Sequence, residues 1–454
     1  MTLRETAPKL STEQYEKNFA EIVPPMSPRQ AAIEAARCLY CFDAPCTVAC
    51  PTHIDVPAFI KKIFTGNPRG SARVILESNI LGQSCGRVCP TEVLCEGACV
   101  MVEKGMKPIE IGRLQRHAVD YVLDRHIQLF HAGAPNGKRV ACIGSGPASL
   151  ACAGELAKRG YRVTIFDRNE SPGGLNTYGI AAYKLRAADS LREVEFVREL
   201  GVEFRQKADV GRDVTFAQLE KEHDAIFIGV GLGETWDLDV AGNGLQGIYG
   251  AIEFIERTKM NSFDKVEIGR RIACIGAGNT AIDVVTAARR LGAEVVHLIY
   301  RRGEKEMPAF QYEYDLAKLD GVTFHWHTQP VRVVEQDGKV SGLECVRTRV
   351  ERGDEQGRSK VSAIPGTEFT IEVDMIVPAI GQKPVTELFR AVSGVEIRSN
   401  GTIAVNDRHQ TGNAKYFAGG DCVNGGKEVV DAVAEGMAAS RGIDAWLGAP
   451  RGKS

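Results

Sequence analysis

The sequence predicts an α/β protein in which a mainly α-helical N-terminal domain precedes two Rossmann-like domains. Three observations lead to this prediction. Eight of the 13 cysteines fall within residues 38–99, among segments with the apolar spacing of helices. From residue 138 onward, short apolar strands alternate with helices and glycine-rich turns, a pattern typical of parallel α/β sheets. A unit of strand, glycine turn, helix and strand occurs twice, at 138–167 and at 270–302.

Length and charge narrow the classes of protein that the chain can belong to. Its 454 residues allow about three domains. The net charge is −2 with both signs interspersed, so we expect no nucleic-acid partner. No apolar run approaches the roughly 20 residues of a membrane helix, and the first thirty residues are polar and charged, unlike a signal peptide. We therefore expect a soluble, cytoplasmic protein without a membrane partner.

The helical domain is expected to span residues 1–130. Residues 1–27 are a polar lead-in, and Ser27-Pro28 provides an N-cap and a first helical position. The helix that starts there delivers Cys38 at its end. Helical apolar spacing recurs at 56–66, 68–79 and 109–130.

The cysteines of this domain form two runs with short spacing. The first run is C-x2-C-x4-C-x3-C-P and the second is C-x3-C-P-x5-C-x3-C. Thiolates at such spacing converge on a soft metal centre, and a run closed by C-P resembles those of bacterial ferredoxins, whose fourth cysteine serves a different cluster. The pattern predicts two iron–sulfur clusters. The eight cysteines are Cys38, Cys41, Cys46, Cys50, Cys85, Cys89, Cys95 and Cys99.

Structural zinc and disulfide bonds are the two alternatives to clusters for these cysteines. A structural zinc site usually shows two C-x2-C pairs, whereas only Cys38 and Cys41 form one here. A disulfide framework suits small secreted domains, but a chain of 454 residues with 44% hydrophobic residues can build cores without such staples. The five remaining cysteines are isolated and are expected to be ordinary core or surface residues.

The first nucleotide-binding unit follows a linker, HAGAPNGK, at 131–138. Gly144 and Gly146 form a tight turn at which the backbone can approach a pyrophosphate, whose charge lies at the helix N-terminus. Ser149 takes the third position of the glycine fingerprint and is small enough for close packing. Asp167 ends the second strand, where an acid accepts hydrogen bonds from ribose hydroxyls. This unit predicts an FAD site.

The second nucleotide-binding unit has the same order of strand, glycine turn, helix and strand, but its second strand does not end in an acid. Gly276 and Gly278 form the turn, Asn279 and Thr280 open the helix, and Ala281 takes the third position. Such a turn again predicts a bound dinucleotide.

The second strand of this unit ends in Arg301 and Arg302. Guanidinium groups bind a ribose 2′-phosphate that an acid would repel, so the pair favours NADPH over NADH without deciding between them. A solvent-exposed strand end without a ligand is the alternative, because arginines are usually at the surface.

The C-terminal portion adds two glycine turns after apolar strands. Residues 374–384 contain a strand and a turn at Gly381, and residues 413–426 contain a strand that ends in Gly419-Gly420-Asp421. Gly420 and the Asp421 carboxylate stand where they can contact the ribityl or phosphate region of a flavin. A simple turn without a ligand is the alternative.

Several of these stretches together resemble the glutamate synthase small-subunit superfamily. The stretches are GSGPASLACA at 144–153, Pro172-Gly173-Gly174, GAGNTAID at 276–283 with Tyr300-Arg301-Arg302, and FAGGD at 417–421. The resemblance covers the chain from about residue 28. Residues 37–52 and 111–116 are most similar to the small flavin and iron–sulfur subunits of bacterial dihydropyrimidine dehydrogenases. Residues 179–186, GIAAYKLR, lack two prolines that the superfamily often carries.

The resemblance implies a ligand set for each of two [4Fe-4S] clusters, and Gly174 as a flavin contact. One cluster would have Cys38, Cys41, Cys46 and Cys99. The other would have Cys50, Cys89, Cys95 and Gln115, a glutamine that glutamate synthase small subunits usually lack. Cys85 would then be free, although its spacing alone suggests a ligand.

The resemblance also implies an arrangement of domains and a partner. A NAD(P)H domain at 252–369 would be inserted in a discontinuous FAD domain at 139–251 and 370–454. Electrons would pass from NAD(P)H to FAD, then through the clusters to a separate catalytic subunit that carries FMN and further clusters and reduces uracil or thymine. This half-reaction needs no acid–base pair, and we predict no catalytic residue.

Two alternatives to this function stay open. One is a glutamate synthase small subunit, or a related ferredoxin- or sulfide-linked NADPH oxidoreductase, with the same cofactors and another partner. The other is a regulatory protein that binds nucleotides and zinc.

Overall fold

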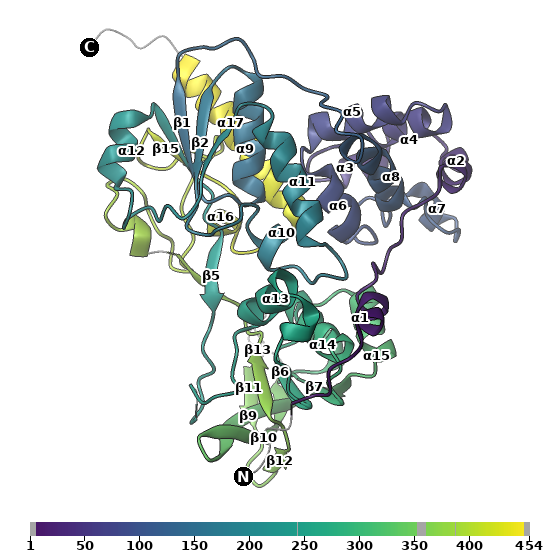
Figure 1. Cartoon of the computed structure of the whole chain (residues 1–454), viewed down its shortest axis with the longest axis vertical. Helices are drawn as coiled ribbons and strands as arrows, with labels where there is room; N and C mark the ends of the chain where they lie inside the picture. Colours follow the sequence, from purple (N-terminus) through teal and green to yellow (C-terminus); the bar gives the residue numbers. More distant parts are fainter. Residues whose placement is uncertain (1–5, 243, 352–359, 386, 449–454) are drawn as a thin grey trace. The chain divides into compact units, whose positions relative to one another are not determined.

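The computed structural model describes residues 6–242, 244–351, 360–385 and 387–448 (Figure 1). The chain forms two compact units. The first unit comprises residues 1–21, 178–183 and 233–383, and the second comprises 22–177, 184–232 and 384–454. The ends of the chain at 1–5 and 449–454, which we assigned to the outer domains, lie outside the described residues, as do 243, 352–359 and 386.

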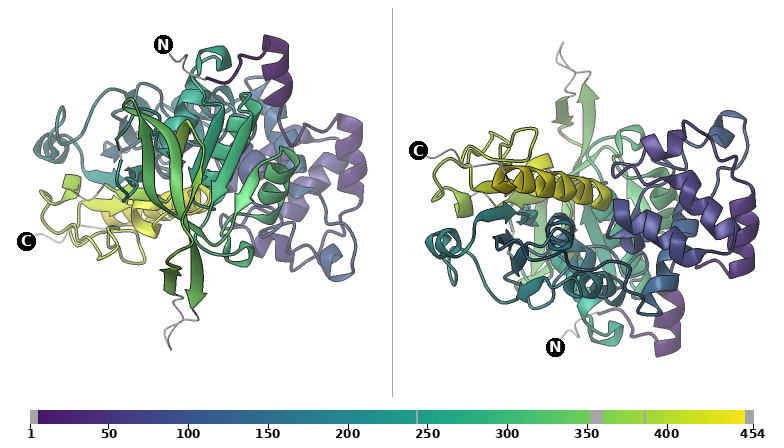
Figure 2. Two further views of the ribbon diagram at one scale, coloured as in Figure 1. Left: turned by 90° about the horizontal axis from the view of Figure 1, so that it is seen from below. Right: turned by 90° about the horizontal axis from the view of Figure 1, so that it is seen from above.

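The N-terminal part of the second unit is helical, as predicted (Figures 1 and 2). Its first helix begins with a capping box in which Ser27 and Gln30 bond each other's backbone N–H, and Pro28 is its first residue. The core lies between α4, α5 and α8, where Phe59, Ile75 and Leu114 are fully buried. The helices are α2 (Pro28–Ala36), α3 (Pro45–Val48), α4 (Val56–Phe64), α5 (Pro68–Ser78), α6 (Gly82–Val88), α7 (Val100–Glu103) and α8 (Ile111–Leu123).

A parallel five-stranded sheet forms the rest of the second unit, in the order β15-β4-β1-β2-β3. Ile143, at the end of β1, is in register with Phe166 of β2 and Ile228 of β4, so these strands end at one edge of the sheet. The long helix α17 packs along α9 (Figure 1). The strands are β1 (Arg139–Ile143), β2 (Arg162–Phe166), β3 (Glu203–Arg205), β4 (Ala225–Ile228) and β15 (Tyr416–Ala418). The helices are α9 (Pro147–Lys158), α10 (Leu175–Tyr178), α11 (Ala187–Arg198), α12 (Phe216–Glu222), η3 (Glu387–Phe389), α16 (Asp421–Asn424) and α17 (Val429–Gly448).

The first unit contains a second parallel sheet, in the order β13-β6-β7-β8. Its strands are β6 (Arg271–Ile275), β7 (Val295–Ile299), β8 (Thr323–His325) and β13 (Met375–Pro378). An antiparallel sheet of β9 (Thr328–Gln336), β10 (Lys339–Glu351), β11 (Lys360–Ala363) and β12 (Phe369–Ile371) accompanies it, and β5 (Leu232–Thr235) pairs with β14 (Gln382–Pro384). The helices are α1 (Thr12–Asn18), α13 (Ala251–Met260), η1 (Phe263–Lys265), α14 (Asn279–Arg290), η2 (Glu304–Glu306) and α15 (Gln311–Leu319).

The predicted fold class is confirmed: a helical N-terminal region precedes two Rossmann-like parts, one of which is inserted in the other. Two segments differ from the expected positions. Strand β13 pairs with β6 in the first unit, although we assigned residues from 370 onward to the outer domain. Residues 6–21 also belong to the first unit, where Phe19 stacks on Phe263 at 4.0 Å and Asn18 donates to the Arg290 carbonyl. Among the described residues, no helix has the length and apolar character needed to span a membrane.

Candidate cofactor sites

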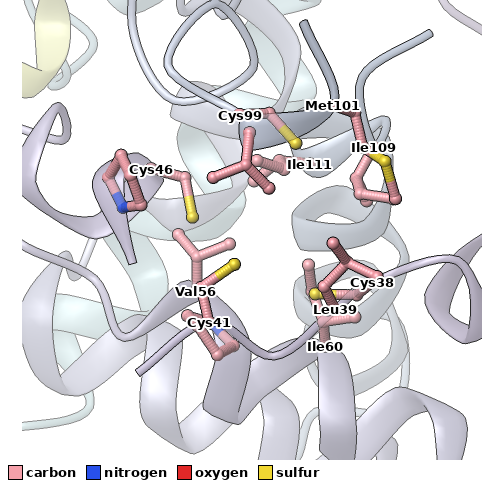
Figure 3. A pocket seen from close by; sticks show the side chains of 13 residues that line it. Cys38, Leu39, Cys41, Cys46, Val56, Ile60, Cys99, Met101, Ile109 and Ile111 are labelled. Atoms are coloured by element: carbon pink, nitrogen blue, oxygen red, sulfur yellow. The ribbon is translucent and has the colours of Figure 1, made fainter. Parts of the chain in front are cut away.

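Four thiols of the helical region, Cys38, Cys41, Cys46 and Cys99, line one pocket, and their sulfur atoms face one another (Figure 3). Three elements bring them together. The first two thiols lie just after α2, where Tyr40 turns the chain with a φ of 52°, the third lies in α3, and the fourth precedes α7. Apolar side chains of α4 complete the wall. The pocket therefore has an all-sulfur donor set in an apolar shell, which suits a soft metal centre.

The electrostatics of this pocket oppose free thiolates. Burial raises the pKa of Cys38, and the thiols of Cys41 and Cys99 add to the rise. Burial also raises the pKa of Cys46 to about 11, with further contributions from Cys38 and Cys99. Four ionised thiols in such surroundings need a compensating positive charge, which a metal centre supplies.

A second group of thiols lies beside α6. The pKa of Cys89 is raised by a hydrogen bond with the Cys85 thiol, by burial, and by the charges of Cys85, Cys95 and Cys50. Burial likewise raises the pKa of Cys95, with contributions from Glu96 and Cys50. The charges of Cys50 and Cys95 act on Cys89, and that of Cys50 acts on Cys95, so these three thiols are the candidates for a second shared centre.

The fourth ligand of this second group has two candidates near α6. Gln115, on α8, donates from Nε2 to the Gly82 carbonyl at 2.8 Å and is 7% exposed. Cys85, on α6, is buried, and its sulfur accepts a hydrogen bond from Asn79 at 3.1 Å.

Within the described part of the chain, no group of three or more His, Cys, Asp or Glu side chains is placed to hold a single metal ion.

The five-stranded sheet presents a glycine-lined edge where its parallel strands end. Gly144 has a φ of +89°, and a Cβ there would lie 2.5 Å from the Gly229 carbonyl oxygen. Gly174 has a φ of +57°, and its Cβ would lie 2.7 Å from the Cα of Gly146. The buried Ser149 hydroxyl has no hydrogen-bond partner among the described residues and packs on Gly229. Glycine therefore allows the backbone segments around this turn to pack closely on one another.

The carboxylates predicted for this site lie at two strand ends. Asp167, after β2, accepts from the Ser145 N–H at 2.7 Å, from the Ser145 hydroxyl at 2.6 Å and from the Asn169 N–H at 2.7 Å. It therefore holds the glycine turn in shape. Asp421 follows Gly420, where a Cβ would lie 3.0 Å from that of Ala148 at the start of α9. The end of β15 is thus beside the turn after β1.

The half-buried Asp421 carboxyl yields a prediction for the flavin-free protein. Burial raises its pKa from 3.8 to about 6. Because the folded pKa exceeds the unfolded one, the free energy of unfolding falls as pH rises from about 4 to 6, by about 3 kcal/mol in all. Asp421→Asn should remove this fall, so urea unfolding should show the variant gaining stability over wild type at pH 8 but not at pH 4. An equal difference at both pH values would contradict this assignment, and Asp407→Asn, at an exposed aspartate of the same unit, serves as control.

The turn after β6 has one crowded glycine and one open glycine. Gly276 has a φ of +128°, and a Cβ there would lie 2.3 Å from the Ala379 carbonyl oxygen. A Cβ on Gly278, the N-cap of α14, would meet nothing within 4 Å. Asn279 and Thr280 follow in the first turn of α14, and the Asn279 side chain accepts from the Phe310 N–H at 3.1 Å. This is the open cradle that a pyrophosphate requires.

The arginines after β7 differ in burial. Arg301 is exposed, whereas the Nε of Arg302 is buried and has no hydrogen-bond partner among the described residues. A buried guanidinium nitrogen without a partner suits an incoming anion.

Arg302→Ala tests this assignment. We expect the KM for NADPH to rise about 10- to 100-fold while the KM for NADH changes little, because a lost hydrogen bond to a charged group is worth about 1.5–3 kcal/mol. Steady-state reduction of a dye by each nucleotide measures both constants. The exposed Arg349 of β10 provides the matched variant, Arg349→Ala, and equal KM values for NADPH in wild type and Arg302→Ala would refute the role.

Two further residues of the glycine-rich segments are Gly381, a predicted flavin contact, and Asp283, which was not predicted to bind a cofactor. Gly381 has a φ of +99° and lies near Trp236 in the first unit, whereas the Gly144 turn belongs to the second. Asp283, inside GAGNTAID, accepts from the Ala181 N–H at 3.3 Å and from the buried Tyr183 hydroxyl at 3.1 Å. The signal for Asp283 is its place between apolar residues of α14, Ile282 and Val284, because buried acids are rare unless paired.

Two family models match this chain, one over the cysteine-rich helical region and one over the Rossmann-like parts. Residues 15–127 match the family model described as dihydropyrimidine dehydrogenase domain II, 4Fe-4S cluster. Residues 138–436 match the model described as pyridine nucleotide-disulphide oxidoreductase.

Curated relatives align over nearly the whole chain. The glutamate synthase [NADPH] small chain of Escherichia coli is 36% identical over 445 residues, 94% of each chain. PreT of Salmonella typhimurium, an NAD-dependent dihydropyrimidine dehydrogenase subunit, is 33% identical over 434 residues, 94% of this chain and 97% of PreT.

Solved structures share the fold. FprA of Mycobacterium tuberculosis in complex with NADPH has a TM-score of 0.57 at 20% identity, and the alignment covers 68% of this chain and 85% of FprA. The chain therefore belongs to the pyridine nucleotide-disulphide oxidoreductase family, among the NAD(P)H-linked flavin and iron–sulfur electron-transfer subunits that include glutamate synthase small chains and PreT.

Proposed function

We propose that this chain is the electron-input subunit of a dihydropyrimidine dehydrogenase. It oxidises NAD(P)H at FAD and passes electrons through two [4Fe-4S] clusters to a catalytic partner, which reduces uracil or thymine. The observation that carries the proposal is the pair of thiol groups in the same compact unit as the glycine-lined sheet edge. When bound, FAD can accept two electrons as a hydride and release them one at a time, as the clusters require.

Each part of the chain has a role in this proposal. Cys38, Cys41, Cys46 and Cys99 hold one cluster, and their shared pocket supports that assignment. The other cluster takes Cys50, Cys89, Cys95 and Gln115, a set supported by the neighbouring thiols and by the position of α8 against α6.

The nucleotide sites take the remaining predicted residues. Gly144, Gly146, Gly174 and Ser149 shape the flavin site, and Asp167, which also holds the turn, accepts from the ribose hydroxyls of FAD. Gly420, Asp421 and Gly381 complete the predicted flavin set. Gly276, Gly278, Asn279 and Thr280 bind the pyrophosphate of NAD(P)H, and Arg301 and Arg302 bind a 2′-phosphate. The NAD(P)H domain is 252–369 in this proposal, extended by the pairing of β13 with β6.

Glutamate synthase is the second candidate, because the E. coli small chain is 36% identical and PreT is 33% identical. The cofactors of the two candidates would be the same and their partners would differ. Gln115 supports the pyrimidine assignment, since the superfamily pattern places a ligand of dihydropyrimidine dehydrogenases there.

Co-expression separates the two candidates. The full chain is purified without oxygen together with the FMN-containing protein that binds it, and NAD(P)H oxidation is followed with uracil or with glutamine plus 2-oxoglutarate. Turnover that depends on uracil supports the proposal. Turnover that depends on glutamine and 2-oxoglutarate contradicts it and supports the second candidate.

A further inference from the structure

One buried carboxyl of the second unit has no part in the proposed cofactor sites. Glu193, on α11, is 1% exposed. Its Oε1 accepts from the backbone N–H of Gln83 at 2.7 Å and of Ser84 at 3.0 Å, and the Ser84 hydroxyl donates to its Oε2. Glu193 thus bonds the first turn of α6, the helix that ends at Cys89.

The partners of Glu193 are neutral groups. The cation that acts on it is Arg87 of α6, which is itself paired with Asp120 of α8 at 3.0 and 2.9 Å and lies 3.7 Å from Asp189 of α11. Burial raises the pKa of Glu193 to about 7, against the lowering effects of its hydrogen bonds and of Arg87. Its charge therefore changes in the physiological range.

Charged groups on three of the helices near Glu193 have partners of their own. On α8, Arg116 pairs with Asp120 at 3.1 Å. On α11, Arg192 pairs with Asp189, and on α9, Lys158 pairs with Glu155. On α6, the thiol of Cys85 follows Ser84 in the sequence and accepts a hydrogen bond from Asn79.

Helix α6 contacts Glu193 at its first turn and carries Cys89, one thiol of the second group, at its C-terminal end. A helix advances about 1.5 Å per residue, so Ser84 and Cys89 are separated by roughly 7–8 Å along the axis. Charges at such a distance interact strongly in a protein interior, where screening by water is weak. An electron added beside Cys89 therefore raises the proton affinity of Glu193.

We propose that Glu193 takes up one proton when one electron enters the cluster held by Cys50, Cys89 and Cys95. The electron comes from NAD(P)H by way of FAD, and the proton comes from solvent. The carboxyl O–H is the bond that forms on the protein. This inference rests on the proposed ligands of that cluster.

The proposal predicts a pH-dependent reduction potential. Ionised Glu193 disfavours electron entry, so the potential should be flat below about pH 7, where the carboxyl is protonated in both redox states, and should fall as pH rises above it. The slope has a limit of about 59 mV per pH unit, the one-electron equivalent of a tenfold change. In Glu193→Gln the side-chain oxygen still accepts from the two N–H groups of α6, but the group no longer titrates, so the slope should vanish.

Redox titration of the full chain, followed by electron paramagnetic resonance at several pH values, measures this slope. Glu195→Gln is the matched control, because Glu195 lies on the same helix, is exposed, and pairs with Arg198 at 2.9 Å. It should keep the wild-type slope. Ser84→Ala removes a bond that lowers the pKa of Glu193, so the pH range of the slope should move upward.

A second readout follows the proton directly. The infrared difference spectrum between reduced and oxidised protein should contain a protonated-carboxyl C=O band that is missing in Glu193→Gln. Equal pH slopes in wild type and Glu193→Gln, with both clusters present, would overturn this inference alone. A wild-type protein without cluster signals would overturn the proposed function as well.

Discussion

Cys46→Ala is expected to lose one of two clusters and to stop delivering electrons to the partner. The Cys46 thiol faces three other thiols in one pocket, and alanine leaves that centre with three sulfur ligands (Figure 3). Iron should fall from about eight to about four atoms per chain. Electron delivery to the partner should fall by about 100-fold or more. Substitution even of residues that only support metal ligands lowers metal affinity or activity about 10- to 100-fold.

The reduction of an artificial dye by NAD(P)H should be largely kept in this variant, because the dye takes electrons from FAD before they reach the clusters. Iron analysis and parallel assays with dye and partner measure both effects. Cys345→Ala is the matched control, since Cys345 is a fully buried thiol of β10 in the other unit. An equal loss of dye reduction in Cys46→Ala would contradict the proposed order of carriers.

Gly146→Ala is expected to lose FAD without losing the fold. Gly146 is the N-cap of α9 with a φ of −72°, and an added Cβ would lie 4.0 Å from its nearest neighbour, the Cα of Gly174. The flavin-free protein can therefore accept the methyl group, and its Tm should change little or rise slightly. The same methyl occupies the space of the pyrophosphate, so FAD affinity should fall about 10- to 100-fold, as overpacking by 1–3 kcal/mol implies.

Flavin content after gel filtration and the Tm of flavin-free protein test this pair of outcomes. Gly448→Ala, at the end of α17, places a methyl group in open space away from the turn and should change neither. A Gly146→Ala protein with wild-type flavin content would show that the turn after β1 does not hold the pyrophosphate.

The fold class was predictable because its signals are local. Alternating strands and helices, the glycine turns at Gly144 and Gly276, and the cap at Ser27 each depend on a few neighbouring residues, and the two turns and the cap form where they were expected. Strand β13 was not predictable in the same way. An apolar strand after an inserted unit can join either sheet, and its pairing with β6 is a long-range contact.

The cofactor sites were predictable in part. Spacing shows that neighbouring cysteines can converge, but it cannot say that Cys99 joins Cys38 and Cys46, which depends on how α7 meets the loop after α2. The family resemblance supplied that grouping. Glu193 was not predictable, because an acid on a helix is usually exposed and only tertiary packing buries this one, whereas the apolar neighbours of Asp283 offer a signal.

Reduction of the full chain by NAD(P)H without oxygen, followed by optical and electron paramagnetic resonance spectra with iron, acid-labile sulfide and flavin quantified, is the most direct test of the central claim. We predict one FAD and about eight iron and eight sulfide per chain, with cluster signals that develop as the nucleotide is oxidised. A flavin that is reduced while iron and sulfide are lacking, or clusters that stay oxidised after the flavin is reduced, would contradict it.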